Sequence, residues 1–411
     1  MLYRNARIGN TEELKDFRVA DGKFAEIGKN LAALQGEESR DLGGRLVLPP
    51  FIESHVHLDT CLTAGDPVWN RSGTLFEGIE CWAKRKEKLS PEDIRERVNR
   101  CVRMYAQNGV QFIRTHVDVT DPSLTALRTM IELRDELRGT VELQIVAFPQ
   151  EGICSYPDGK ALMEEAVRLG ADCVGAIPHY EFTREYSVES LNFALQLAAE
   201  NGLLVDVHCD EIDDEASRGL ETVACRALEL GLYDRVTASH TTAMHSYNNA
   251  YVLRLMRLLK LSRINFVSNP LVNTHLQGRV DTYPKRRGVT RVKELLAEGI
   301  NVSFGHDDIF DPWYPMGMGS LRDVVFLGLH VCQMMGYDDI CESYKLITEN
   351  AAKTLHLGDG YGIATGRPGS FVVLDAENWY SALTKNAPVL LSVHGGRTLA
   401  EAEPGTGRVL F

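Results

Sequence analysis

Two histidines separated by one residue, His55 and His57, follow the apolar run 46–52. In a β-strand, side chains two residues apart point to the same face, so a strand here would present both imidazoles together. Two imidazoles on one rigid strand make half of a metal site. A histidine pair with this spacing often occurs by coincidence, so a metal site requires further ligands elsewhere in the chain.

Other polar side chains come at or just after the ends of further predicted strands: Gln150, His208, His240 and Asp307. In a (β/α)8 barrel the catalytic groups lie at the carboxyl ends of the strands, so these residues would meet the histidine pair. Three imidazoles and one carboxylate suit a divalent zinc or iron ion that keeps an open position for water. The predicted ligand set is therefore His55, His57, His208 and Asp307.

Glu211 comes three residues after His208. A carboxyl group just past a ligand-bearing strand can reach a substrate atom beside the metal without binding the metal, which suits general acid–base catalysis. The alternative is a solvated acid, because the surrounding loop also contains Asp210, Asp213 and Asp214. Position alone leaves both interpretations open.

Short β-rich runs alternate with amphipathic helical patterns along most of the chain. The predicted strands are the one that carries His55 and His57, followed by 112–119, 142–148, 173–177, 203–208, 236–240, 264–268 and 301–305. A helix start is predicted at Ser90 and Pro91, and the 3.6-residue period marks 189–201, 221–230 and 292–298. Eight strands alternating with helices predict an α/β fold, a (β/α)8 TIM-like barrel. A doubly wound open sheet is disfavoured because the chain has no G-x-G-x-x-G turn.

The two ends of the chain differ from this pattern. Short β-like runs cover 17–20 and 22–27 near the start, and 370–374 and 390–393 near the end. Neither end alone is large enough to bury a core. We predict that residues 1–48 and 360–411 together form a small β-sandwich domain, and that residues 49–359 form the catalytic barrel.

Composition excludes several classes of protein. With 44% hydrophobic and 25% charged residues, the 411-residue chain is typical of a globular protein. A net charge of −13 disfavours nucleic acid or an anionic membrane as a partner. Nine cysteines without any C-x-x-C indicate neither a zinc ribbon nor a disulfide framework. The chain shows no signal-peptide layout and no apolar run of 18 residues, so we expect a cytoplasmic protein.

The segments that carry these residues resemble the amidohydrolase superfamily and, within it, the bacterial cytosine deaminases. The similarity runs essentially end to end, and its most specific segments are PPFIESHVHLDT (49–60), VAFPQEG (146–152), DVHCDE (206–211), SHTTAMH (239–245), GHDD (305–308) and DPWYP (311–315). The resemblance implies one iron or zinc ion on the ligand set above. Superfamily members with two metals bridge them through a modified lysine on the fourth strand, and 171–177 contains no lysine.

The resemblance also implies an activity, the hydrolytic deamination of cytosine to uracil and ammonia. The metal would lower the pKa of a water molecule and supply hydroxide for attack on C4. Asp307 would take the proton from that water, His240 would hold and polarise it, and Glu211 would protonate ring nitrogen N3. Relatives assemble into homo-oligomers, so the same is expected here.

The substrate pocket is implied in the same way. The amide of Gln150 can pair with the O2/N1 edge of cytosine, since it offers both a donor and an acceptor. Trp313, Phe148 and Leu75 would form apolar walls, although without the resemblance ordinary packing is the better interpretation of Phe148 and Leu75. Asp308 would crowd the C5 side of the ring and favour cytosine over 5-methylcytosine.

Several alternatives stay open. A deaminase of another small ring, such as isoguanine, 5-methylcytosine or creatinine, would differ only in pocket shape. The missing lysine disfavours a cyclic-amide hydrolase, and the missing C-x-x-C disfavours a nucleic-acid-editing zinc deaminase. A non-catalytic metal-binding scaffold is disfavoured by the presence of Glu211 and His240. His116 and Asp118 are interpreted as structural, and the role of His245 is left open.

Overall fold

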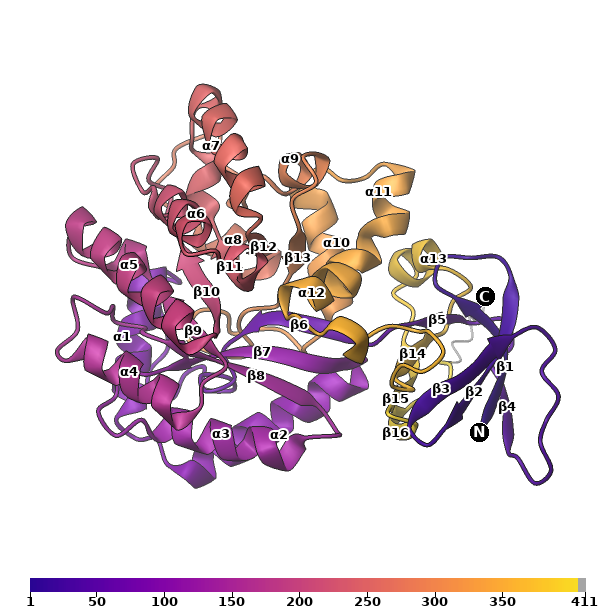
Figure 1. The fold of residues 1–411 in the computed structure, drawn as a ribbon. Helices are drawn as coiled ribbons and strands as arrows, with labels where there is room; N and C mark the ends of the chain where they lie inside the picture. The colour runs from indigo at the N-terminus through magenta and orange to yellow at the C-terminus, as the bar shows by residue number, and fades with distance from the viewer. Residues whose placement is uncertain (406–411) are drawn as a thin grey trace, which may run out of the picture.

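The computed structural model describes residues 1–405 and contains two eight-stranded sheets (Figure 1). In one of them, the barrel sheet, every hydrogen-bonded pair is parallel and the strands follow one another in chain order. Its strands are β6 (Phe51–Val56), β7 (Val110–Asp118), β8 (Glu142–Phe148), β9 (Cys173–Ala176), β10 (Leu204–Cys209), β11 (Val236–His240), β12 (Asn265–Ser268) and β13 (Val302–Phe304). The predicted barrel is confirmed, with strand bounds close to those expected from the sequence.

The first and last strands nearly close the barrel. β6 and β13 share no regular ladder, but Val56 and Asp307 form an isolated parallel bridge just past the end of β13. Two backbone hydrogen bonds reinforce it, from His57 N to Asp307 O at 3.0 Å and from Asp307 N to His55 O at 2.8 Å. The seam of the barrel therefore places three predicted metal ligands side by side.

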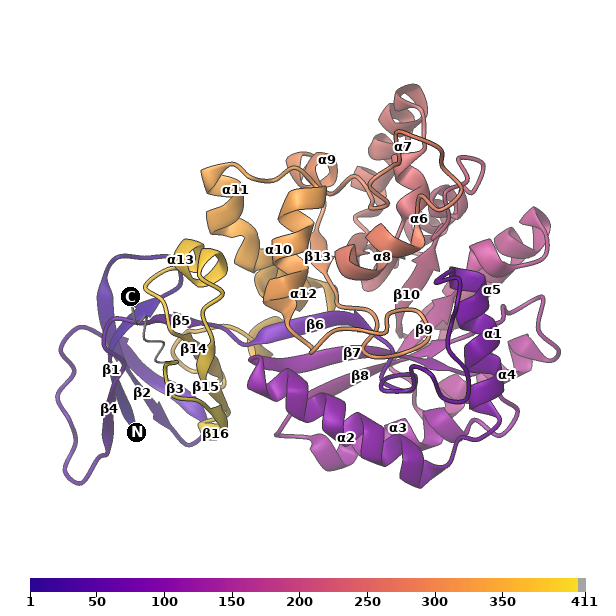
Figure 2. The ribbon, with the colours of Figure 1, turned by 180° about the vertical axis from the view of Figure 1, so that it is seen from behind.

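Helices cover the outside of the barrel (Figures 1 and 2). They are α1 (Leu75–Lys86), α2 (Pro91–Gln107), α3 (Thr125–Leu137), α4 (Gly159–Leu169), α5 (Arg184–Asn201), α6 (Gly219–Glu229), α7 (Asn249–Ser262), α8 (Pro270–Leu276), α9 (Val292–Ala297), α10 (Leu321–Val331), α11 (Tyr337–Glu342) and α12 (Glu349–Thr354). α2 begins as predicted, with the Ser90 hydroxyl accepting a hydrogen bond from Asp93 N. No helix within residues 1–405 is both long enough and apolar enough to cross a membrane.

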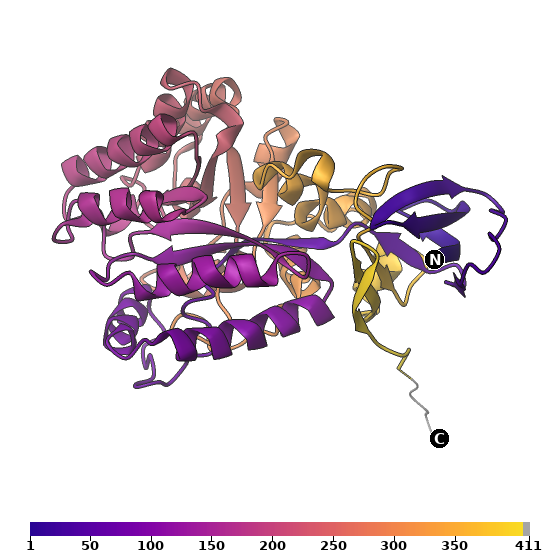
Figure 3. The same cartoon turned by 60° about the horizontal axis from the view of Figure 1, so that its bottom comes forward.

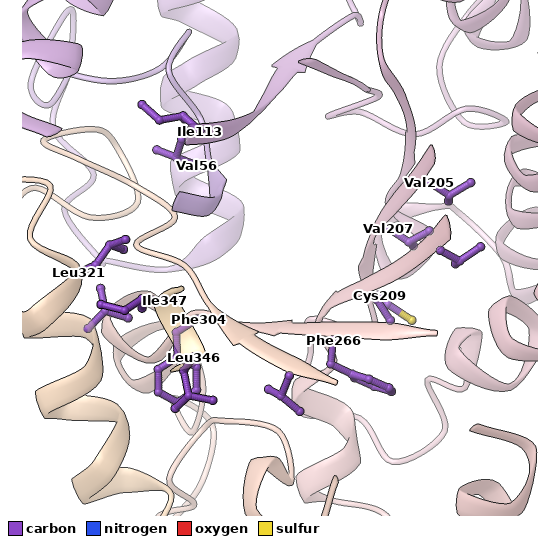
Figure 4. Close-up of a cluster of buried hydrophobic side chains, with 14 of the residues drawn as sticks. Val56, Ile113, Val205, Val207, Cys209, Phe266, Phe304, Leu321, Leu346 and Ile347 are labelled. Carbon is purple, nitrogen blue, oxygen red and sulfur yellow. The ribbon is translucent and has the colours of Figure 1, made fainter. Parts of the chain in front are cut away.

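The core lies between the strands and these helices, and strand alternation decides what faces it. Val205, Val207 and Cys209 of β10 are fully buried in the large hydrophobic cluster that Figure 4 shows in part. Side chains of a strand alternate between faces, so Asp206 and His208 point into the barrel instead. A single strand thus supplies both the core and the polar interior.

The second sheet combines both ends of the chain. Its strands are β1 (Leu2–Ile8), β2 (Leu14–Ala20), β3 (Lys23–Gly28), β4 (Ser39–Asp41), β5 (Leu46–Leu48), β14 (Phe371–Leu374), β15 (Val389–His394) and β16 (Arg397–Glu401), with α13 (Trp379–Thr384) between β14 and β15. β5 pairs with β14 and so joins the two ends (Figure 3). Phe17 of β2 lies 5.0 Å from Phe371 of β14, so the mixed sheet folds over a small core of its own, as predicted. Residues 406–411 of the predicted segment lie outside the described residues.

Candidate active site

The four predicted metal ligands converge at one point at the carboxyl end of the barrel. His208 Nε2 lies 3.2 Å from His55 Nε2 and 3.0 Å from His57 Nε2. Asp307 Oδ1 lies 3.3 Å from His55 Nε2 and 3.7 Å from His57 Nε2. Nitrogen ligands 2.0–2.1 Å from a tetrahedral zinc ion are separated by about 3.3 Å, so these spacings fit a divalent metal ion.

The charge states of the ligands fit a metal as well. Burial lowers the pKa of His55, His57 and His208 well below the ordinary value, so the imidazoles are neutral, as metal ligands must be. Burial, together with the nearby Glu211 carboxyl, raises the pKa of Asp307. A cation held among these side chains would offset the cost of burying the Asp307 charge.

A buried polar chain orients His55. Its Nδ1 lies 2.9 Å from Ser239 Oγ, and this hydroxyl donates to Asp206 Oδ1 at 2.6 Å. Arg114 donates to the other oxygen of Asp206 at 2.8 Å and balances its charge. The His116 ring packs 3.9 Å from the ring of His55, and its Nε2 lies 3.5 Å from Asp206 Oδ1. This arrangement points the Nε2 atom of His55 into the site, as partners of metal-binding histidines usually do.

Glu53 fills the gap in hydrogen bonding at the barrel seam. Its carboxylate is fully buried and accepts from His55 N at 3.0 Å, His306 N at 3.0 Å and the Tyr105 hydroxyl at 2.9 Å. A Cβ atom at Gly305 would lie 2.6 Å from Asn269 Oδ1 and 2.9 Å from His55 Cβ, so this position needs glycine. Burial raises the pKa of Glu53 to about 8.

The raised pKa of Glu53 predicts a pH-dependent stability. The folded pKa of about 8 exceeds the ordinary value of 4.5, so the contribution of Glu53 to stability is fully present below pH 4.5 and is lost as the pH rises to about 8. Glu53→Gln stays neutral, and relative to this variant the wild type should lose up to about 1.4 kcal/mol of unfolding free energy per pH unit. Urea unfolding at pH 5 and pH 8.5 measures the difference. Glu38→Gln, at an exposed position, is the control, and equal pH profiles for Glu53→Gln and wild type would contradict the prediction.

Glu211 and His240 form a second buried cluster beside the ligands. Glu211 Oε1 lies 3.3 Å from His240 Nδ1, which in turn lies 3.8 Å from Asp307 Oδ2. Glu211 is 4% exposed, and burial raises its pKa to about 8, so it carries a proton near neutral pH. It is therefore a buried, protonated carboxyl group, as a general acid requires, and not the solvated loop acid that the sequence left open. His240 and Asp307 have φ angles of 65° and 72°, a strained conformation of the kind found at functional sites.

Two asparagines that sequence reasoning missed lie against His240. Asn269 and Asn273 follow β12, the seventh barrel strand, and both are fully buried. Asn273 Nδ2 lies 3.0 Å from His240 Nδ1 and 3.1 Å from Glu211 Oε1, and Asn269 Nδ2 lies 3.4 Å from the same His240 atom. The signal was the Asn-Pro-Leu-Val-Asn segment at 269–273, directly after a predicted strand.

A narrow cavity opens onto the predicted metal ligands and the cluster of Glu211 and His240. Its lining contains His57, Leu75, Gln150, Ile177, His208, Glu211, His240, Leu276, Asp307, Asp308 and Trp313. Four of the predicted pocket residues thus meet here, and Ile177 and Leu276 were not foreseen. The Trp313 indole donates to Leu75 O at 3.1 Å and packs over Gly78, where a Cβ atom would lie 2.4 Å from the indole.

Phe148 is placed differently from the other predicted pocket residues. Its ring stacks on the His208 ring at 4.0 Å, and it does not line the cavity. Phe148 therefore packs against the ring of a predicted metal ligand. His245 does not line the cavity either.

Asp308 faces the cavity beside a second carboxyl group. Asp311 is fully buried and accepts from Thr60 Oγ1 at 2.8 Å and from the backbone N of Trp313 at 2.9 Å. Burial and the charge of Asp311 raise the pKa of Asp308 well above the ordinary value. Asp308 can therefore present a neutral carboxyl group to a ligand.

Asp118 belongs to a buried clamp around Lys86. The Lys86 ammonium lies 3.0 Å from Asp118 Oδ2 and 2.6 Å from Glu151 Oε1, and the Trp82 indole donates to the same Asp118 oxygen at 2.9 Å. The clamp joins α1 to the loop that carries Gln150. This supports the structural interpretation of Asp118.

The sequence matches the Amidohydrolase family over residues 38–400, so the chain belongs to that family. The barrel and the cluster of three histidines and one aspartate agree with this assignment. Among solved structures, it is similar to 5-methylcytosine deaminase from Klebsiella pneumoniae, crystallised with 5-fluorocytosine. The two are 51% identical with a TM-score of 0.97 over 100% of this chain and 99% of that one.

More distant relatives have other activities. The N-isopropylammelide isopropyl amidohydrolase of Pseudomonas sp. (strain ADP) is 27% identical over 98% of both chains. The pterin deaminase of Rhizobium rhizogenes is 26% identical over 95% of this chain and 88% of that one. The names of these two relatives give different substrates, so membership of the family does not identify the substrate of this chain, and the residues of its cavity have to be considered.

Proposed function

We propose that this protein catalyses the metal-dependent hydrolytic deamination of cytosine to uracil and ammonia. The observation that carries the proposal is the buried Glu211 carboxyl, which meets His240 and Asp307 in a cavity beside the converging imidazoles. Similarity to a deaminase of a cytosine-type base supports it. A homo-oligomer and a cytoplasmic location remain predictions from the sequence.

One divalent zinc or iron ion would be held by His55, His57, His208 and Asp307. Such an ion supplies Lewis-acid chemistry, since it lowers the pKa of a water molecule enough to provide a nucleophile near neutral pH. Three imidazoles and one carboxylate accept either metal.

The protein's own acids would move the protons. Asp307 accepts a proton from the attacking water, while Glu211 gives its proton to N3 and makes C4 electrophilic. As the C4–N4 bond breaks, the amine takes the proton held by Asp307 and leaves as ammonia. Glu211 recovers a proton from the new hydroxyl at C4, which becomes the carbonyl of uracil. Both acids then return to their starting states.

The cavity supports a pyrimidine of this kind. Gln150 lines it and can pair with the O2/N1 edge of the ring. Leu75 and Trp313 provide apolar walls against the ring faces. The test is ammonia release from cytosine by protein with a defined metal content, and bound metal without ammonia release would contradict the proposal.

Deamination of 5-methylcytosine is a second candidate, favoured by the 51% identity with a 5-methylcytosine deaminase. The two candidates differ at C5 of the ring, where we expect Asp308 to lie. The ratio of kcat/KM values for the two bases separates them.

Asp308→Ala should admit a methyl group at C5. Fitting or excluding one methyl group is worth about 10- to 200-fold, so kcat/KM for 5-methylcytosine relative to cytosine should rise about 10-fold or more. Steady-state assays with both bases measure the ratio. Asp214→Ala, at an exposed acid near the site, is the control. A ratio equal to that of the wild type would remove Asp308 from the specificity argument.

A further inference from the structure

Asn273 contacts both Glu211 and His240, two proposed catalytic side chains that belong to different barrel units. Glu211 follows β10, and His240 ends β11, whereas Asn273 lies on α8 after β12. Three consecutive barrel units therefore meet at one amide group. The seventh unit contributes this contact to the cluster, and Asn269 adds a longer one of 3.4 Å to His240 Nδ1.

The geometry of the amide determines what it does. Its NH2 group lies 3.1 Å from Glu211 Oε1 and 3.0 Å from His240 Nδ1, and an NH2 group has one hydrogen for each acceptor. Because Glu211 Oε1 accepts from Asn273, the other carboxyl oxygen, Oε2, is the one that carries and transfers a proton. Because His240 Nδ1 accepts, a neutral His240 carries its proton on Nε2.

The position of Asn273 is itself rigid. Asn273 is fully buried, and its backbone N donates to Asn269 O at 2.9 Å in the first turn of α8. α8 begins at Pro270, whose fixed φ angle suits a first helical position. A buried donor on a helix with a fixed start can hold two partners in one geometry with little loss of freedom.

We propose that Asn273 is the positioning residue that holds Glu211 and His240 together and selects Glu211 Oε2 as the proton-transfer atom. The inference rests on the proposed function, because it assigns the geometry of the same acid. Asn273 need not touch the substrate, and it acts through its two partners.

Asn273→Leu tests the proposal, because leucine has a similar volume and no donor. Losing a hydrogen bond to a catalytic acid should lower kcat about 10- to 100-fold, while KM should change less than about 3-fold. Metal content should equal that of the wild type. Asn273→Ala is the second variant, to be used if leucine does not fit the site.

Asn265→Ala is the matched control. Asn265 is a buried asparagine at the opposite end of β12, and its amide donates to Asp234 O at 2.6 Å, away from the catalytic cluster. Its loss should lower the melting temperature as much as the loss of Asn273 but leave kcat unchanged. A kcat for Asn273→Leu within about twofold of this control, or a loss expressed in KM alone, would overturn the proposal.

Crystal structures of the wild type and Asn273→Leu decide the same point without an assay. The proposal expects the 3.3 Å separation of Glu211 Oε1 and His240 Nδ1 to be kept in the wild type and lost in the variant. An unchanged separation in the variant would overturn it. If the wild type released no ammonia from cytosine or 5-methylcytosine, the proposed function would be wrong. The two crystal structures would still show whether Asn273 positions Glu211 and His240.

Discussion

Glu211→Gln should lower kcat for cytosine about 10²- to 10⁴-fold and leave the bound metal in place. Glutamine keeps the size of the side chain and can still accept from Asn273, but it has no acidic proton to give to N3. The measurement is steady-state ammonia release, with the metal content of each preparation determined by elemental analysis.

The dependence of kcat/KM on pH in the wild type should also show that Glu211 acts as an acid. The acid acts in its protonated form, and its pKa is about 8, so kcat/KM should fall as the pH rises above that value. Glu215→Gln, at an exposed position in the same loop, is the control and should retain the wild-type profile. Activity in Glu211→Gln close to that of the control would mean that N3 is protonated by another group.

His208→Ala should weaken zinc binding by more than about 100-fold. Partners that only orient metal ligands cost 10- to 100-fold when they are removed, and His208 is expected to be a ligand itself. It contacts both other imidazoles at 3.0–3.2 Å, so its loss opens the centre of the set. Competition with a chromophoric chelator measures the affinity.

Thermal unfolding gives an independent readout of the same loss. A ligand that binds only the folded state raises its stability, so excess zinc should raise the melting temperature of the metal-free wild type and not that of His208→Ala. His245→Ala, at a position outside the cavity lining, should behave like the wild type. Equal zinc stabilisation of His208→Ala and the wild type would exclude His208 from the ligand set.

The barrel and its ligands could be predicted from the sequence because both depend on local pattern. β-rich runs alternating with helical periods define the strands, and the carboxyl ends of barrel strands face one region of space. His55, His208 and Asp307 each sit at such an end, so their meeting follows from topology alone. The predicted ligand set is brought together within 3.0–3.7 Å.

The residues that the sequence did not reveal depend on tertiary placement. Asn273 reaches the site because α8 begins directly after β12; the Asn-Pro segment after the predicted strand hinted at this, but the contact with Glu211 and His240 depends on how three barrel units pack. Glu53 lies two residues before His55 on β6, and its role at the barrel seam depends on how β6 meets β13. Phe148 was expected against the substrate, but its ring stacks on His208 and does not line the cavity.

The most direct test of the central claim is ammonia release from a panel of amino-heterocycles by enzyme loaded with one zinc or iron ion per chain. The panel contains cytosine, 5-methylcytosine, isoguanine and creatinine. We predict the highest kcat/KM for cytosine, followed by 5-methylcytosine, and loss of activity when the metal is removed. Fully metal-loaded enzyme that releases ammonia from neither pyrimidine would contradict the account.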